Sequence, residues 1–154
     1  MTAAQIVQVI VLVAQLTGQP AELMVELARA ESGLVVDALG DRAALTPAAL
    51  APAAVGEASL EAGAPGFGEA VEAGASGGLF CFKWETAQWT AGRVGLEIGP
   101  EDLANPWVNA FLAAKVLEWG YGGWFHAMER VPAHVRPEPD DAVFRRAPMW
   151  EAGR

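Results

Sequence analysis

Helical segments that stop at glycines constrain the fold of this chain more than any other feature. Three such segments, each followed directly by a glycine, are residues 4–17, 20–32 and 106–119. Glycine ends a helix readily, because it adopts the left-handed conformation at little energetic cost. Asn105 and Pro106 supply a cap and a first-turn residue for the last of the three. The sequence therefore predicts a mainly α fold.

Shorter elements are expected between and after these helices. Residues 85–94 predict a short helix ending before Gly95, and residues 124–130 predict a final one. Residues 79–84 favour an extended strand, with Leu79, Cys81 and Lys83 on one face and aromatic side chains on the other. We therefore expect a small β element within a helical protein.

Glu31 is the strongest candidate for chemistry. It continues the every-fourth-residue apolar pattern of Leu23 and Leu27, and Gly33 places it in the last helical turn. Burial and the negative end of the helix dipole would both raise the pKa of its carboxyl group. A carboxylic acid protonated near neutral pH can protonate a glycosidic leaving oxygen. The plainer interpretation is a solvated glutamate at a frayed helix end.

Three short motifs occur in order along the chain. They are Glu31, Ser32 and Gly33; then Ser76, Gly78, Leu79 and Phe82; then Asn105, Pro106, Asn109 and Ala110. These motifs resemble those of the goose-type lysozyme and soluble lytic transglycosylase superfamily, in which a helix ends in Glu-Ser-Gly, the cleft strand reads Ser-x-Gly-Leu-x-Gln-Phe/Ile, and a later helix begins Asn-Pro-x-x-Asn-Ala. The resemblance covers roughly residues 20–127.

The chain departs from the family pattern in three places. Cys81 stands where the strand motif carries glutamine, which replaces a polar contact with a weakly hydrogen-bonding thiol. The stretch between Asp41 and Ser76 is longer than the usual connection. The Ala-Tyr-Asn motif of many transglycosylases has no clear counterpart, and Tyr121 is the nearest tyrosine.

The resemblance implies a lysozyme-like α+β fold with a small β-hairpin lining a cleft. The length of 154 residues fits one domain spanning residues 1–154. It also implies cleavage of the β-1,4 bond between N-acetylmuramic acid and N-acetylglucosamine in peptidoglycan, with Glu31 as catalytic acid. The candidate substrate-binding residues are Ser32, Asp41, Ser76, Gly78, Leu79, Phe80, Cys81, Trp84, Asn109 and Tyr121.

Two chemistries fit a glutamate acid of this kind. A lytic transglycosylase needs one carboxyl group, which acts first as acid and then as base. A lysozyme that inverts configuration needs a second carboxylate to position water. Candidates for that second group are Asp41, followed by Asp37, Glu57, Glu69 and Glu72. A third interpretation is a non-catalytic structural or interaction module, for example in a phage particle.

Composition and charge exclude several other classes. A net charge of −9 argues against nucleic acid as partner. One cysteine and two histidines give no spaced set of zinc ligands, and no cofactor is expected. The apolar run of residues 6–16 is too short to span a bilayer.

No basic residue precedes Arg29, so we expect no signal peptide. A lytic enzyme would then be cytoplasmic until released, or virion-associated. The sequence does not indicate an oligomeric state.

Two regions differ from the rest in composition. Residues 42–75 are rich in Ala, Gly, Pro and Glu, as expected of a lid over the cleft or of a plain surface excursion. From residue 131 the chain reads as an irregular tail, in which Val143, Phe144, Met149 and Trp150 could dock on the body.

Overall fold

A computed structural model describes residues 1–40 and 66–138 of the chain. Predictions that fall on residues 41–65 and 139–154, including Asp41, Glu57 and most of the insertion, lie outside the described residues. Helices make up 61% of the described part and strands 5%, so the prediction of a mainly α protein is confirmed. The helices of the described part are α1 (Ala3–Thr17), α2 (Ala21–Ser32), α3 (Phe67–Glu72), α4 (Trp84–Arg93) and α5 (Pro106–Glu118), with 3-10 turns η2 (Pro100–Ala104), η3 (Gly122–Trp124) and η4 (His126–Arg130).

The first two helices stop at Gly18 and Gly33, as the sequence predicted, and each begins within one residue of its expected start. Thr2 and Gln5 form a capping box that starts α1, in which each side chain binds the other residue's main-chain nitrogen. Gly33 ends α2 at φ 67°, and its N–H donates to the carbonyl oxygen of Arg29. This left-handed stop fixes Glu31 in the last turn of α2.

A small antiparallel sheet lies beside these helices. Its strands, in the order β1-β2-β3, are β1 (Leu39–Gly40), β2 (Ser76–Gly77) and β3 (Phe82–Lys83). The β2–β3 pair is the hairpin that we expected. β1 adds a third strand, with Leu39 opposite Gly77 and Gly40 opposite Ser76.

The prediction of one extended strand over residues 79–84 is wrong. The backbone turns between the two strands of the hairpin, where the N–H of Cys81 donates to the carbonyl oxygen of Gly78 and Cys81 has φ 47°. Trp84 already begins α4. The sequence suggested a strand because a short run of apolar residues can be either a buried strand or a buried turn, and the sequence pattern alone does not distinguish them.

The later helices agree with the sequence except at the end. The side chain of Asn105 caps α5 by accepting a hydrogen bond from the nitrogen of Trp107, 3.0 Å away. The helix expected over residues 124–130 is instead two 3-10 turns, η3 and η4, separated by Phe125. Residues 131–138 contain no helix or strand, as predicted for the start of the tail.

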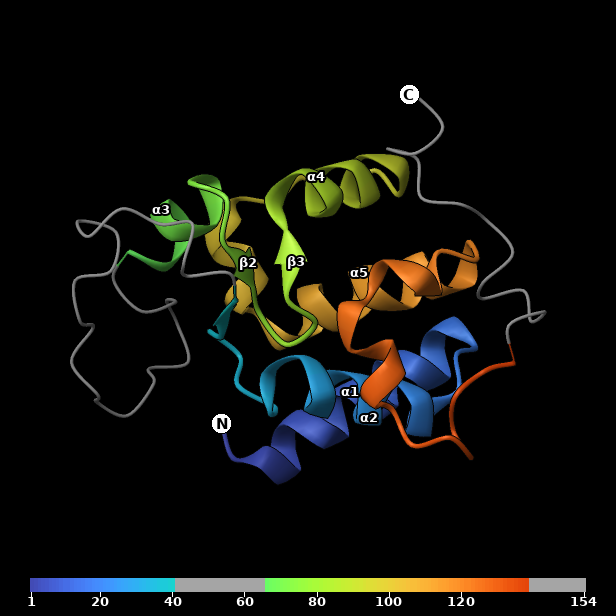
Figure 1. Cartoon of the computed structure of the whole chain (residues 1–154). Helices are drawn as coiled ribbons and strands as arrows, with labels where there is room; N and C mark the ends of the chain where they lie inside the picture. Colours follow the sequence, from blue (N-terminus) through green and yellow to red (C-terminus); the bar gives the residue numbers. More distant parts are fainter. Residues whose placement is uncertain (41–65, 139–154) are drawn as a thin grey trace.

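The helices enclose one main hydrophobic core. α1 packs against both α2 and α5, α2 packs against η4, and α4 packs against α5 (Figure 1). Leu23, Leu27 and Leu112 are among the fully buried side chains of this core. Burying a leucine contributes about 1.5–3 kcal/mol, so this core is the main source of stability. None of the helices in the described ranges is long and apolar enough to cross a bilayer.

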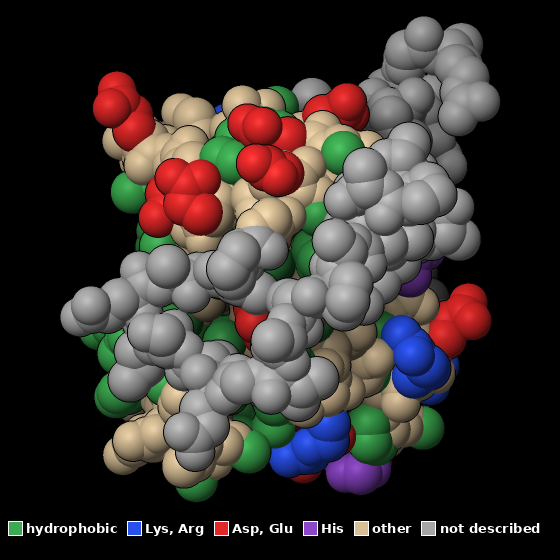
Figure 2. Space-filling view, turned by 90° about the vertical axis from the view of Figure 1, so that its left-hand side faces the viewer, with side chains coloured by type: hydrophobic (Ala, Val, Ile, Leu, Met, Phe, Trp, Pro, Cys, Tyr) green, Lys and Arg blue, Asp and Glu red, His purple; other side chains and the backbone are tan. Residues whose placement is uncertain are grey.

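Charge is unevenly distributed over the described surface. Acidic side chains gather on the upper part of the molecule in the view of Figure 2, and basic and histidine side chains lie lower. The first turns of α3, η2 and α4 carry acidic residues: Glu69, Glu85, Glu101 and Asp102. An anionic ligand therefore gains no general electrostatic attraction from this part of the surface.

Candidate active site

The carboxylate of Glu31 is held by a distant segment of the chain. The side chain is half-buried, and its Oε1 accepts a hydrogen bond of 2.9 Å from the main-chain nitrogen of Ala127 in η4. α2 packs against η4, so the contact belongs to a helix-to-turn interface. Glu31 is thus an ordered side chain in the protein body, and the plainer interpretation of a frayed, solvated glutamate does not fit this geometry.

Two local effects on this carboxylate oppose each other. The end of α2 presents main-chain carbonyl oxygens, whose partial negative charge disfavours an ionised side chain nearby. The N–H of Ala127 favours the ionised form, because it donates a hydrogen bond to the carboxylate. The raised pKa expected from the sequence remains a prediction, which a pH profile can test.

The turn of the hairpin lies against the end of α2. The thiol of Cys81 donates a hydrogen bond of 3.4 Å to the main-chain oxygen of Glu31, fifty residues earlier. The N–H of Gly78 donates to the carbonyl oxygen of Ala38 at 3.0 Å, which ties the same turn to the loop after α2. The turn that contains Gly78 and Cys81 therefore folds back onto the end of the helix that carries Glu31.

Asn109 supports this hairpin from inside the protein. Its side chain is fully buried, and its Oδ1 accepts a hydrogen bond of 2.9 Å from the nitrogen of Phe80. Its Nδ2 donates to the carbonyl oxygens of Leu103 at 2.9 Å and Gly77 at 3.4 Å. The residue was expected to bind substrate; in the structure its amide binds main-chain groups, which places it behind the candidate site.

Gly78 makes the close approach of Asn109 possible. It has φ 83°, and a Cβ atom at this position would overlap Nδ2 of Asn109 and the carbonyl oxygen of Leu103. A glycine is required here both for the backbone conformation and for the space. The glycine of the expected strand motif thus has a packing function in the hairpin turn.

The other residues predicted to bind substrate differ in their solvent exposure. Those buried in the described structure are Ser76, Leu79, Phe80 and Tyr121. Ser32, Cys81 and Trp84 are half-buried, although the hydroxyl of Ser32 donates to the carbonyl oxygen of Ala28 within its own helix. The structure therefore brings Glu31 and Cys81 together and leaves Trp84 partly accessible where α4 begins.

Aromatic packing fixes the segment that holds Glu31. The ring of Phe125 lies 6.0 Å from that of Phe80 and 5.8 Å from that of Phe82, measured between centroids. Tyr121 stacks on Trp124 at 4.4 Å, and both contact Trp89 of α4. The chain directly before His126–Arg130 is therefore anchored, and with it the N–H that binds Glu31.

Sequence reasoning missed Ala127 and Phe125. A main-chain N–H is present in every residue except proline, so no side chain marks the one that binds a carboxylate. Phe125 had a weak signal, since it is an apolar residue in a segment expected to be helical. The roles of both residues depend on contacts between segments that are far apart in the sequence.

The other described candidates for a second carboxylate lie on two elements. Asp37 is half-buried in the loop after α2, and Glu69 and Glu72 lie on α3. Within residues 1–40 and 66–138, no group of three or more His, Cys, Asp or Glu side chains is arranged to hold a metal ion.

Comparison of the chain with protein-family models, curated proteins and solved structures finds no match. Any functional assignment therefore rests on the sequence motifs and on the geometry around Glu31.

Proposed function

We propose that the protein is a peptidoglycan-cleaving lytic transglycosylase that acts on the bond between N-acetylmuramic acid and N-acetylglucosamine. The observation that carries this proposal is the hydrogen bond between Glu31 and Ala127, next to the hairpin turn that contains Cys81. It gives one half-buried carboxyl group a fixed orientation, which an acid catalyst requires. The motif resemblance supplies the substrate class.

The proposed reaction uses Glu31 twice. Its protonated carboxyl group gives a proton to the glycosidic oxygen as the bond to the muramyl C1 breaks. The resulting carboxylate takes a proton from the muramyl 6-hydroxyl, whose oxygen bonds to C1, so the product is a 1,6-anhydro sugar and no water is consumed. The N–H of Ala127 would stabilise the carboxylate between these steps.

Two alternatives share the same fold and motifs. A hydrolytic lysozyme would add water across the bond, with a second carboxylate such as Asp37 or Asp41 positioning it. A non-catalytic module of a phage particle would keep the fold without the chemistry. In either lytic version, we propose that the enzyme reaches the cell wall as a virion component or after release from the cytoplasm.

A zymogram with purified peptidoglycan tests catalysis directly. Wild type should clear the gel, and Glu31→Gln should not, because the amide cannot donate a carboxylic proton. Glu26→Gln is the matched control: it neutralises a carboxylate on the same helix that pairs with Arg29 at the surface, and it should clear normally. Absence of clearing by wild type, or clearing by Glu31→Gln, would contradict the proposal.

Mass spectrometry of the released fragments separates the two chemistries. Anhydromuramyl ends are lighter by one water than hydrolysed ends. Products that all carry anhydromuramyl ends support the transglycosylase, whereas reducing ends alone would establish the lysozyme.

A further inference from the structure

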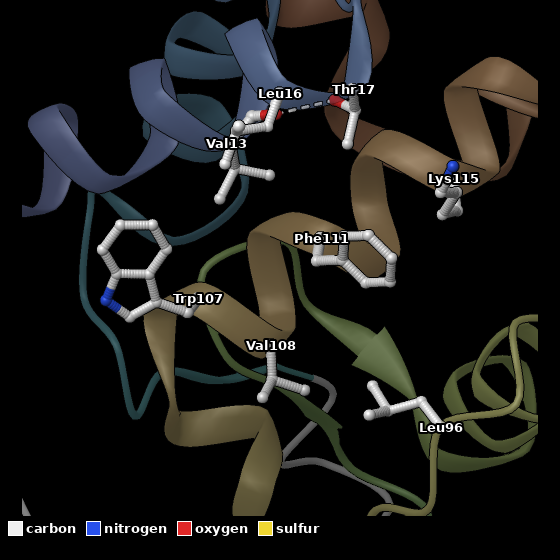
Figure 3. Close-up of a pocket in the computed structure, with 8 residues that line it drawn as sticks. All are labelled: Val13, Leu16, Thr17, Leu96, Trp107, Val108, Phe111 and Lys115. Atoms are coloured by element: carbon white, nitrogen blue, oxygen red, sulfur yellow. Dashed lines mark hydrogen bonds between the residues drawn. The ribbon is translucent and has the colours of Figure 1, made fainter.

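A second surface feature, formed by residues other than those around Glu31, is an apolar groove of about 450 Å³. It lies between the end of α1, the first three turns of α5 and the loop after α4 (Figure 3). We call it the α1–α5 groove, and its lining residues are Val13, Leu16, Thr17, Leu96, Trp107, Val108, Phe111 and Lys115.

Large apolar side chains on this groove are exposed to solvent. The exposed fraction is 81% for Leu16, 45% for Trp107 and 38% for Leu96. Leaving apolar area in water costs about 25 cal/mol per Å², so covering these side chains would stabilise the protein. Apolar surface gathered in a concave site is typical of an interaction surface.

The last described part of the chain passes the start of α2, the helix that follows α1. His134 lies 3.7 Å from the carboxylate of Glu22, at the start of α2, and Val135 packs against the core. Only residues 18–20 separate α1, which supplies Leu16 to the groove, from α2. His134, four residues before the end of the described range, therefore lies on the side of the molecule where α1 ends and α2 begins, and the red end of the described trace lies beside the blue helices in Figure 1.

The segment that follows has the length and composition to fill the groove. Residues 139–154 can span up to about 50 Å when extended, at about 3.3 Å per residue. Its large apolar side chains are Val143, Phe144, Met149 and Trp150.

Charges of both signs occur on the segment and beside the groove. Arg145 and Arg146 lie between the two apolar pairs of the segment, and Asp140, Asp141 and Glu151 lie on either side of them. Glu97 directly follows Leu96 and is exposed, whereas Glu118 already pairs with Lys115 at 2.6 Å. An arginine of the segment near Glu97 would help to orient it as apolar side chains cover the groove.

We infer that residues 139–154 of the same chain dock in the α1–α5 groove, with Phe144 and Trp150 covering Leu16 and Trp107. The groove then serves as an intramolecular docking surface, and its occupation does not depend on the chemistry assigned to Glu31.

Paramagnetic relaxation in the full-length chain tests this inference. A spin label on Gly153→Cys, in a Cys81→Ser background, should reduce the NMR signal intensity of the methyl groups of Leu16 and Leu96 and of the indole N–H of Trp107. The double substitution Phe144→Glu and Trp150→Glu should restore these signals, because it removes the apolar anchors.

A control on the groove side keeps the test independent of folding. Leu16→Glu should abolish the effect on Leu96 and Trp107, while Val35→Glu should leave it unchanged, since Val35 is also an exposed apolar residue but does not line the groove. Thermal unfolding of each variant confirms that it folds.

Two outcomes would overturn the inference. The first is unchanged intensity at all three groove residues in the labelled chain. The second is a loss of intensity that arises only between molecules, detected by mixing isotope-labelled chain without the spin label with spin-labelled chain at natural isotope abundance. That result would show that a second copy occupies the groove.

Discussion

The main-chain nitrogen of Ala127 lies 2.9 Å from Oε1 of Glu31, and the two residues are 96 positions apart in the chain. The bond joins the end of α2 to η4, two elements that also pack through the core. It connects the orientation of the candidate catalytic group with the integrity of η4, the last helical turn of the described residues.

Substitutions at Glu31 should separate stability from activity. Glu31→Gln keeps an oxygen acceptor for Ala127 and should change the free energy of unfolding by less than about 1 kcal/mol, whereas Glu31→Leu leaves the N–H without this acceptor and should cost about 1–2 kcal/mol more. Urea denaturation measures both. Equal stability of the two variants would show that the bond contributes little to folding.

Removing the amide of Asn109 should destabilise the protein strongly. Asn109→Leu leaves the buried N–H of Phe80 and the carbonyl oxygen of Leu103 without their partner, and each unmet group costs about 1–3 kcal/mol. Asn109→Asp keeps the acceptor for Phe80, but it places a carboxylate oxygen against the carbonyl oxygens of Leu103 and Gly77, so it should also be strongly destabilising near neutral pH. Asn105→Ala, at the cap of the same helix, should cost only about 1 kcal/mol and serves as the comparison in urea denaturation.

Gly78→Ala should be more harmful than the same change at another left-handed glycine. At Gly78 the new methyl group would overlap Asn109 and Leu103, whereas a methyl group on Gly95, at φ 71°, would meet no atom within 4 Å beyond its chain neighbours. Gly95→Ala should therefore cost about 1–2 kcal/mol from backbone strain alone. Thermal unfolding of both variants gives the comparison, and similar melting temperatures would argue against the close contact.

Alkylation of Cys81 should inhibit the proposed activity. Its sulfur lies 3.4 Å from the main-chain oxygen of Glu31, so a bulky maleimide adduct would occupy space next to this residue. The clearing rate of the wild type should fall after treatment, and that of Cys81→Ser should be the same with and without reagent. Full activity of a quantitatively alkylated wild type would place substrate away from the hairpin turn.

The sequence predicted the helices well because their signals are local. Apolar periodicity and the caps at Gly33 and Asn105 act within a few residues, so α2 and α5 begin and end within two residues of their expected bounds. The hairpin was expected, but its turn was assigned to a strand, since the conformation of Cys81 depends on contacts with Glu31 and Gly78.

The candidate site was predictable only in part. Glu31 and the nearby hairpin followed from motif order. The burial of Asn109 and the donor at Ala127 did not, because each depends on main-chain groups of segments distant in the sequence. Short motifs indicate residue types in order, and they do not show which of those side chains face a ligand and which support it from behind.

The buried amide of Asn109 has a consequence for engineering. It connects the hairpin, η2 and α5 through a single side chain, so the hairpin is not an independent unit that can be exchanged alone. A graft of a hairpin from another protein, or a new loop designed to alter specificity, would have to keep a glycine at position 78 and leave Asn109 and the carbonyl group of Leu103 in register.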